Sequence, residues 1–212
     1  MADKLDLKRQ FKHLYSPSAK TPAIVEVPAM NFLMVDGMGD PNTSESFRQA
    51  IEALYSLSYT IKFHIKLSGG QDFVVMPLEG LWWSDDPACA APASFIAAKD
   101  KLKWTMMIAQ PEPVTAELVQ TGRREVSKKK DLPTLDQLRW EQFDEGLAAQ
   151  VMHIGPYTDE VPTIERLQAF ITSEGYRPHG KHHEIYLSDP NRTAPERLKT
   201  IIRYPVERAS SA

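Results

Sequence analysis

The chain has 212 residues, of which 42% are hydrophobic and 25% are charged, and its formal net charge is −3. This composition is that of an ordinary globular protein, and it argues against a nucleic-acid or membrane surface. The single cysteine, Cys89, excludes an intrachain disulfide and has no base close in sequence to activate it. We therefore expect a cytoplasmic protein without nucleic-acid or membrane partners.

The first half of the chain predicts a leader followed by strand, helix, strand and strand. In the leader, residues 1–21, five side chains have helical spacing and could pack on the body of the protein: Leu5, Leu7, Phe11, Leu14 and Tyr15. Residues 23–35 predict a strand that bends at Pro28. A helix follows, with one face made by Phe47, Ile51, Leu54, Ser58 and Ile61. Residues 73–83 and 101–109 complete this half as strands.

The second half repeats this order. Residues 138–154 predict a long strand that is interrupted at Glu145-Gly146, where a bulge would fit. A second helix is indicated by the spacing of Val161, Ile164, Leu167, Phe170 and Ile171. Strands are predicted at 182–188 and 198–206.

Sequence matches at three points in the same order indicate an internal duplication. Aligning Gly37 with Gly155 brings L-W-W-S-D-D-P onto I-Y-L-S-D-P, and L-K-W-T-M-M-I onto L-K-T-I-I-R-Y. The predicted fold is α+β: a duplicated strand–helix–strand–strand unit whose antiparallel sheet has helices on one face and a ligand pocket between the halves. The predicted boundaries are a leader at 1–21, one domain at 22–206 made of repeats 22–113 and 136–206, a linker helix at 114–135, and a tail at 207–212.

Glu184 lies at the centre of the alternating stretch K-H-H-E-I-Y-L-S-D-P, on the same strand face as Tyr186. A carboxylate is costly to bury unless it is paired, hydrogen-bonded or protonated. In the repeat alignment Glu184 falls on Gly80, so the carboxylate is not part of the duplicated scaffold. We predict that Glu184 faces a cavity and acts there as a general acid or base. The structural alternative is a salt bridge to Lys181 or Arg203.

Aromatic side chains and methionines indicate a flat apolar site for an aromatic molecule, including a cationic one. They are Trp82, Trp83, Trp104, Trp140, Tyr157, Tyr186, Met34 and Met106. Plain core packing is the alternative for each aromatic residue, and Trp82 and Trp83 point to opposite faces of a regular strand. Glu79 is a second carboxylate of interest, but Pro77 and Gly80 disturb the alternation around it. Pocket and sheet-edge positions both stay open for Glu79.

No metal or cofactor is expected from the sequence. His182 and His183 are adjacent in a predicted strand, so they point to opposite faces and cannot easily share an ion. His153 has no ligand spacing to either of them. No phosphate-binding glycine loop, dinucleotide fingerprint or nucleophile elbow is present.

Five motifs resemble the GyrI-like small-molecule-binding proteins, especially the stand-alone bacterial group without a DNA-binding domain. They are P-L-E-G-L-W-W, W-T-M-M-I-A-Q-P, E-G-L-A-A-Q-V-M-H-I-G-P-Y, H-H-E-I-Y-L-S-D-P and L-K-T-I-I-R-Y-P-V. The resemblance runs from Pro22 to Val206 and implies the fold of the effector-binding domains of multidrug-sensing regulators. In those domains an acidic residue in an aromatic pocket contacts cationic drugs, and Glu184 looks like that residue. Some stand-alone members hydrolyse cyclopropane-bearing DNA-alkylating cytotoxins.

This resemblance implies that Glu184 assists water in opening the strained ring. Such a reaction also needs a donor for the developing oxyanion, which Tyr157 or Tyr186 could supply. The predicted catalytic residues are Glu184, Tyr157 and Tyr186, and the predicted ligand-binding residues are Glu79, Trp82, Trp83, Trp104, Met106, Trp140 and His153. The expected partner is a small aromatic ligand, bound by a monomer or homodimer. A non-catalytic drug-binding protein and a protein-interaction module, such as a topoisomerase inhibitor, are the alternatives.

Overall fold

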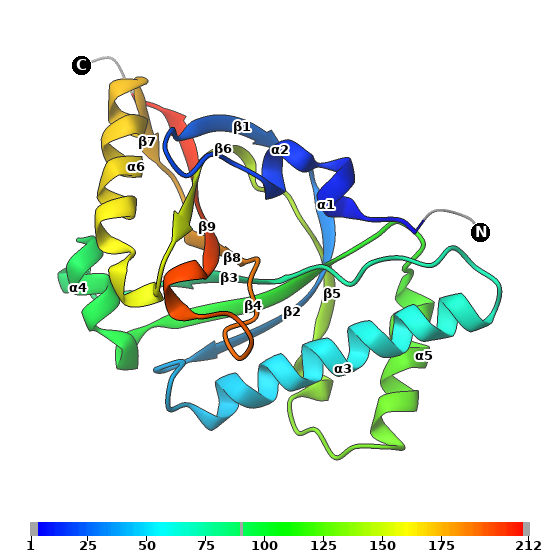
Figure 1. The fold of residues 1–212 in the computed structure, drawn as a ribbon. Helices are drawn as coiled ribbons and strands as arrows, with labels where there is room; N and C mark the ends of the chain where they lie inside the picture. The colour runs from blue at the N-terminus through cyan, green and yellow to red at the C-terminus, as the bar shows by residue number, and fades with distance from the viewer. Residues whose placement is uncertain (1–3, 90, 210–212) are drawn as a thin grey trace.

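The computed structural model describes residues 4–89 and 91–209. Its main sheet is antiparallel and has the strand order β1-β6-β9-β8-β3-β4-β2-β5, and β7 pairs with β9 (Figure 1). The strands are β1 Ala23–Val27, β2 Met30–Met38, β3 Leu78–Trp83, β4 Lys103–Gln110, β5 Arg139–Phe143, β6 Gly146–Ile154, β7 Tyr176–Pro178, β8 His182–Tyr186 and β9 Lys199–Arg208. The helices are α1 Leu7–Gln10, α2 Lys12–Tyr15, α3 Glu45–Leu67, α4 Pro92–Ala97, α5 Ala116–Ser127 and α6 Val161–Ser173.

The predicted duplication is confirmed by the order and register of the strands. The units β2-α3-β3-β4 and β6-α6-β8-β9 meet where β3 pairs with β8 in the middle of the sheet. Gly80 pairs with Glu184 across this junction. On the outer sides, Gly80 pairs with Met106 and Glu184 pairs with Ile202. Glu184 and Gly80 are therefore equivalent positions, as the sequence alignment predicted.

The glycine of the first unit that corresponds to Gly155 is not the one chosen in the sequence alignment. The Gly39 amide donates to the carbonyl oxygen of Leu102 at 2.8 Å, and the Gly155 amide donates to that of Leu198 at 3.0 Å. Both glycines have positive φ, 111° and 142°, which a residue with a Cβ rarely adopts. Gly39, and not Gly37, is thus the equivalent of Gly155. The turn geometry establishes this correspondence. The sequence alignment of the first strands was shifted by two residues.

Both long strands predicted at the start of the repeats are in fact pairs of strands from opposite halves of the sheet. β1 pairs with β6, and β5 pairs with β2, so the two halves exchange their edge strands. The chain changes direction beside Pro28, which has no amide to donate to a ladder, and at Gly146, where φ is 66°. The bulge predicted at Glu145-Gly146 is therefore a crossing point. This exchange joins the two repeats into one sheet.

Helices α3 and α6 lie on the same face of the sheet, which we call the helix face. On α3, Ser58 accepts a 3.3 Å hydrogen bond from Gln110 of β4. On α6, three side chains pack on strands β6 and β9: Ile164, Leu167 and Ile171. The predicted linker helix is the shorter α5, whose Gly122 lies so close to α3 that a Cβ there would be 2.9 Å from the Ile61 side chain. α5 thus extends the packed layer.

The leader covers the other face, which we call the leader face. Leu14 and Tyr15 of α2 are buried there, and α1 and α2 are separate turns that meet at Phe11. Gln150 on β6 donates to the carbonyl oxygen of His13 at 2.8 Å. No helix in the described ranges is long and apolar enough to cross a membrane.

Candidate functional site

The candidate site is centred on Glu184, at the junction of the two repeats on the helix face. His182, Glu184 and Tyr186 alternate along β8, so their side chains share this face. The Glu184 side chain is only 14% exposed, and its Oε1 lies 2.8 Å from His182 Nε2. Burial alone would raise the pKa of Glu184, but the hydrogen bonds from His182 and Tyr186 lower it below its usual value. The carboxylate is therefore held ionised inside the protein.

A short chain of hydrogen bonds orients Glu184. Trp82 Nε1 donates to the Tyr186 hydroxyl at 2.8 Å, and Tyr186 donates to Glu184. A Cβ at Gly80 would lie 2.7 Å from the Trp82 nitrogen and 3.1 Å from the Tyr186 oxygen. The indole and the phenol can therefore meet only because Gly80 has no side chain. Of the two adjacent tryptophans, Trp82 is the one at this site.

Tyr157 forms the rim of the site. It begins the short 3-10 turn Tyr157–Asp159 after β6, and its ring packs edge-on against Tyr186 with centroids 5.8 Å apart. Tyr157 is 37% exposed, so its ring also reaches solvent. Partial burial, with the nearby charges of Glu184 and Glu160, raises its pKa to about 12. This phenol thus keeps its proton at neutral pH and can donate a hydrogen bond to a ligand.

Glu160 is a functional candidate that sequence reasoning missed. It is the N-cap residue of α6 and only 2% exposed, and its carboxyl oxygen lies within 4.8 Å of that of Glu184. Burial and the Glu184 charge raise the pKa of Glu160 well above its ordinary value. The sequence gives little signal for this role, because an acid at a helix start is usually explained by the helix dipole. Two neighbours were also missed, His182 and Tyr204, whose rings lie 4.9 Å apart.

The cluster could bind a cation. The ligand atoms of Glu160, His182 and Glu184 lie within 4.8 Å of one another. Two carboxyl oxygens and an imidazole nitrogen are a donor set that suits a divalent metal, and the same negative charge suits an organic cation. A proton shared by the two carboxyl groups would remove the repulsion between them equally well.

Trp104 and Met106 lie on the helix face and support the site from β4. Phe47 of α3 packs against Trp82 and Trp104, with ring centroids 5.8 and 5.2 Å away. The Met106 sulfur would be 3.2 Å from a Cβ at Gly80. Both β4 residues are buried, so they form the base of the site beneath Trp82.

Trp140 and His153 do not join the Glu184 cluster. Trp140 lies on edge strand β5, four strands away from β8, where it packs against the main core. His153 lies two strands away on β6, and its ring nitrogens are 3.0 Å from the Thr163 hydroxyl and 3.2 Å from the Pro156 carbonyl oxygen. The structure therefore does not bring either of these predicted ligand contacts to Glu184.

Glu79 does not join the Glu184 cluster either, because it points to the leader face. There it accepts from the Tyr15 hydroxyl at 3.1 Å and lies 3.1 Å from His183 Nε2. His183 Nδ1 lies 2.8 Å from Glu145, which accepts from Arg203 at 2.9 Å. Burial would lower the pKa of His183, but the flanking carboxylates raise it to about 9. We call Glu79, Glu145, His183 and Arg203 the leader-face network.

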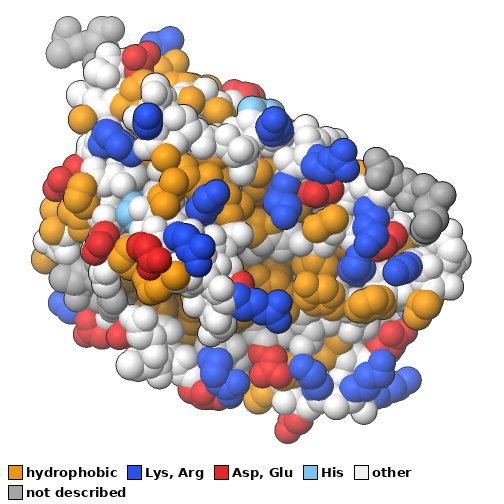
Figure 2. All heavy atoms as spheres, viewed as in Figure 1, with side chains coloured by type: hydrophobic (Ala, Val, Ile, Leu, Met, Phe, Trp, Pro, Cys, Tyr) orange, Lys and Arg blue, Asp and Glu red, His pale blue; other side chains and the backbone are white. Residues whose placement is uncertain are grey.

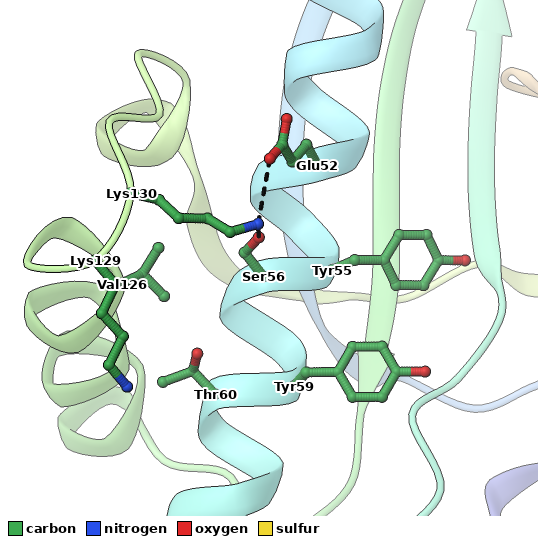
Figure 3. Close-up of a pocket in the computed structure, with 8 residues that line it drawn as sticks. All are labelled: Glu52, Tyr55, Ser56, Tyr59, Thr60, Val126, Lys129 and Lys130. Atoms are coloured by element: carbon green, nitrogen blue, oxygen red, sulfur yellow. Dashed lines mark hydrogen bonds and ion pairs between the residues drawn. The ribbon is translucent and has the colours of Figure 1, made fainter.

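Two of the hollows on the surface of the described residues lie elsewhere, and Glu184 lines neither of them. One, of about 410 Å³, lies between α3 and α5, where Lys130 bonds to Glu52 and Ser56 (Figure 3). The other, of about 370 Å³, lies on the leader face, where the Lys181 ammonium sits 3.4 Å from the centroid of the Trp83 ring. Trp83 is thus the tryptophan that points away from the candidate site. The lysines in both hollows make them unfavourable for a cationic ligand.

Hydrophobic side chains are also gathered across the middle of the face seen in Figure 2, between the α6 side and the α3 side. Lysines and arginines are scattered around this area. Exposed apolar areas of this kind are typical of surfaces that take part in binding.

The chain is similar to proteins of known structure. A structure described as a hydrolase from Listeria innocua is 40% identical with a TM-score of 0.83, and it matches 96% of this chain and 100% of its own. An uncharacterised conserved protein from Listeria innocua is also 40% identical over the same shares, with a TM-score of 0.87. The C-terminal domain of EcmrR, 13% identical with a TM-score of 0.56 over 89% of this chain and 98% of its own, shares the fold.

The chain matches no curated protein sequence. The model of the GyrI-like small molecule binding domain matches residues 20–207, which include both repeats and every residue of the Glu184 cluster. The chain therefore belongs to the GyrI-like family of small-molecule-binding domains.

Proposed function

We propose that this protein binds flat aromatic molecules beside Glu184 and hydrolyses reactive, cyclopropane-bearing cytotoxins. The observation that carries the proposal is a buried carboxylate, kept ionised by His182 and Tyr186, beside the partly exposed phenol of Tyr157. Such a carboxylate is ionised at neutral pH, so it can accept a proton from a water molecule beside it. The similarity to a Listeria innocua protein described as a hydrolase supports a hydrolytic reaction.

In the proposed reaction Glu184 takes a proton from a water molecule, and the water oxygen forms a bond to a ring carbon of the substrate. The strained carbon–carbon bond breaks, and its electron pair moves into the conjugated carbonyl group. Tyr157 donates its proton to the resulting oxyanion, and the proton on Glu184 then returns to the Tyr157 phenolate through solvent. The sum is the addition of one water molecule, with both side chains restored.

Tyr186 has a different part in this scheme. Its hydroxyl donates to Glu184 and accepts from Trp82, so its single proton is already committed. Tyr186 therefore positions the base, and Tyr157 is the phenol that faces the ligand. The sequence alone left both tyrosines open as the oxyanion donor.

The test is turnover of a duocarmycin-type cyclopropane compound by substoichiometric protein, with ring-opened product measured by chromatography. Replacing Glu184 by Gln keeps the size and a hydrogen-bonding group but removes the base, so we expect turnover to fall about 10²–10⁴-fold. Glu141→Gln, at an exposed position on edge strand β5, is the matched control and should retain full turnover.

Two results would contradict the proposal. Unchanged turnover in Glu184→Gln would remove this carboxylate from the mechanism. Protection of the compound at one-to-one stoichiometry without product would show that the protein sequesters its ligand and performs no chemistry.

A further inference from the structure

Two carboxyl groups in contact inside a protein pose an electrostatic problem. Glu160 and Glu184 come from different elements, the start of α6 and the middle of β8, yet their carboxyl oxygens lie within 4.8 Å of each other. Glu160 is only 2% exposed, and the Glu184 side chain is 14% exposed. Like charges this close in a dry site cannot both be ionised unless a cation or a proton lies between them.

We propose that Glu160 and Glu184 share one proton, which resides on Glu160, and that this carboxyl pair is the acid–base unit of the site. This inference deepens the proposed function and rests on it for its catalytic meaning. Glu160 is only 2% exposed, so its side chain has little surface with which to contact a ligand. It is therefore a positioning residue that donates a hydrogen bond to the base.

The groups around the pair supply no lysine or arginine to neutralise it. In the described ranges no lysine or arginine forms an ion pair with either carboxyl. The titratable and polar groups that face Glu160 are His182, Glu184 and Tyr186 from β8, Thr200 and Tyr204 from β9, and Tyr157 from the turn before α6.

The environments of the two acids also differ in a way that assigns the proton. Glu184 Oε1 lies 2.8 Å from His182 Nε2, and Tyr186 also donates to this carboxyl, so its charged form is favoured. Glu160 Oε1 is buried and has no hydrogen-bond partner in the described part of the chain, and burial and the Glu184 charge both favour the neutral form of Glu160. Two carboxyl groups whose environments move their pKa values in opposite directions are a recognised arrangement for acid–base chemistry.

Infrared spectroscopy of the ligand-free protein tests the shared proton directly. At neutral pH we expect the carbonyl band of a protonated carboxylic acid, which shifts when glutamate is labelled with ¹³C. Glu160→Gln should lose this band. Glu165→Gln, at an exposed position on the same helix α6, is the matched control and should keep it.

Absence of the band in the wild type, or its persistence in Glu160→Gln, would overturn the inference. Stoichiometric binding of Zn²⁺ that removes the band would also overturn it, because the position would then belong to a metal ion. None of these measurements involves turnover, so their outcome is separate from that of the Glu184→Gln hydrolysis test.

The pH dependence of turnover provides a second test, which a merely structural role would not satisfy. Glu160→Ala removes the donor to Glu184, so the pKa of Glu184 rises and the acidic limb of kcat/KM should move to higher pH by about one unit or more. Glu160→Gln retains an amide donor and should keep the limb near its wild-type position. An unmoved limb in Glu160→Ala would contradict the positioning role.

Discussion

The two faces of strand β8 present a comparison between adjacent buried charges. His183 and Glu184 are neighbours in sequence, but one points to the leader face and the other to the helix face. The leader-face network contains two carboxylates, Glu79 and Glu145, and two cations, His183 and Arg203. On the helix face, the described residues place one basic side chain, the imidazole of His182, in the cluster with Glu160 and Glu184.

The two clusters differ in the balance between their acidic and cationic groups. In the leader-face network each acid has a cationic partner, and the remaining donors of Arg203 are used by Gln150 and the Leu14 carbonyl. Such a network is electrically satisfied, so it offers no binding capacity to a ligand. The helix-face pair has an excess of acid over base and partly exposed aromatic rings beside it. An unbalanced cluster of this kind keeps capacity for a proton or a cation, which is a property of a functional site.

The largest effect should come from breaking the balanced network. Arg203→Met leaves Glu145 buried without its guanidinium partner, and the expected cost is about 3–5 kcal/mol of unfolding free energy. Urea denaturation followed by circular dichroism measures it. Arg139→Met, which removes an exposed bidentate pair with Asp36 on edge strand β5, is the control and should cost less than about 1 kcal/mol. Similar losses in both variants would show that the network is not a stability element.

The same network predicts how stability depends on pH. The pKa of His183 is raised to about 9, so its contribution is complete below about pH 6.5 and is lost as the pH rises through 9. The loss should amount to about 3 kcal/mol between these limits. The pKa of Glu145 is lowered to about 2, because the charges of His183 and Arg203 outweigh its burial, so its contribution is lost only as the pH falls from about 4.5 towards 2.

Urea unfolding at a series of pH values from 6 to 10 measures the alkaline effect. His183→Gln should be less stable at pH 6.5 and should show a much flatter dependence, because Gln does not titrate. A wild-type curve with no decline across this range would show that His183 is not the charged centre of the network.

Much of the fold could be predicted from the sequence, since apolar periodicity and the repeated motifs are local signals. The equivalence of Gly80 and Glu184 came from such a motif, and the strand register confirms it. The exchange of β1 and β5 between the halves could not be predicted, because periodicity shows that a strand exists and not which strand it pairs with. Pro28 and Gly146 indicated a bend in each case, but not that the chain crosses to the other half of the sheet.

The part of the site whose residues lie on one strand could be predicted from the sequence. Alternation put Glu184 and Tyr186 on one face, as observed. Glu160 and Tyr204 come from other elements, and only the packing of α6 and β9 brings them to Glu184. His153 does not reach Glu184 for the converse reason. It lies on the correct face of its strand, but two strands away, where it bonds to the turn before α6.

The smallest effect should come from the hydrogen bond that orients the base. Trp82→Phe keeps an aromatic ring but removes the donor to Tyr186, which raises the pKa of that phenol and weakens its hydrogen bond to Glu184. A net hydrogen bond is worth about 1 kcal/mol, so turnover should fall about fivefold. Trp104→Phe is the matched control, because the buried Trp104 Nε1 has no hydrogen-bond partner. If both variants lowered turnover equally, ring volume on the helix face would explain the effect, and the Trp82–Tyr186 bond would have no separate part in holding Glu184.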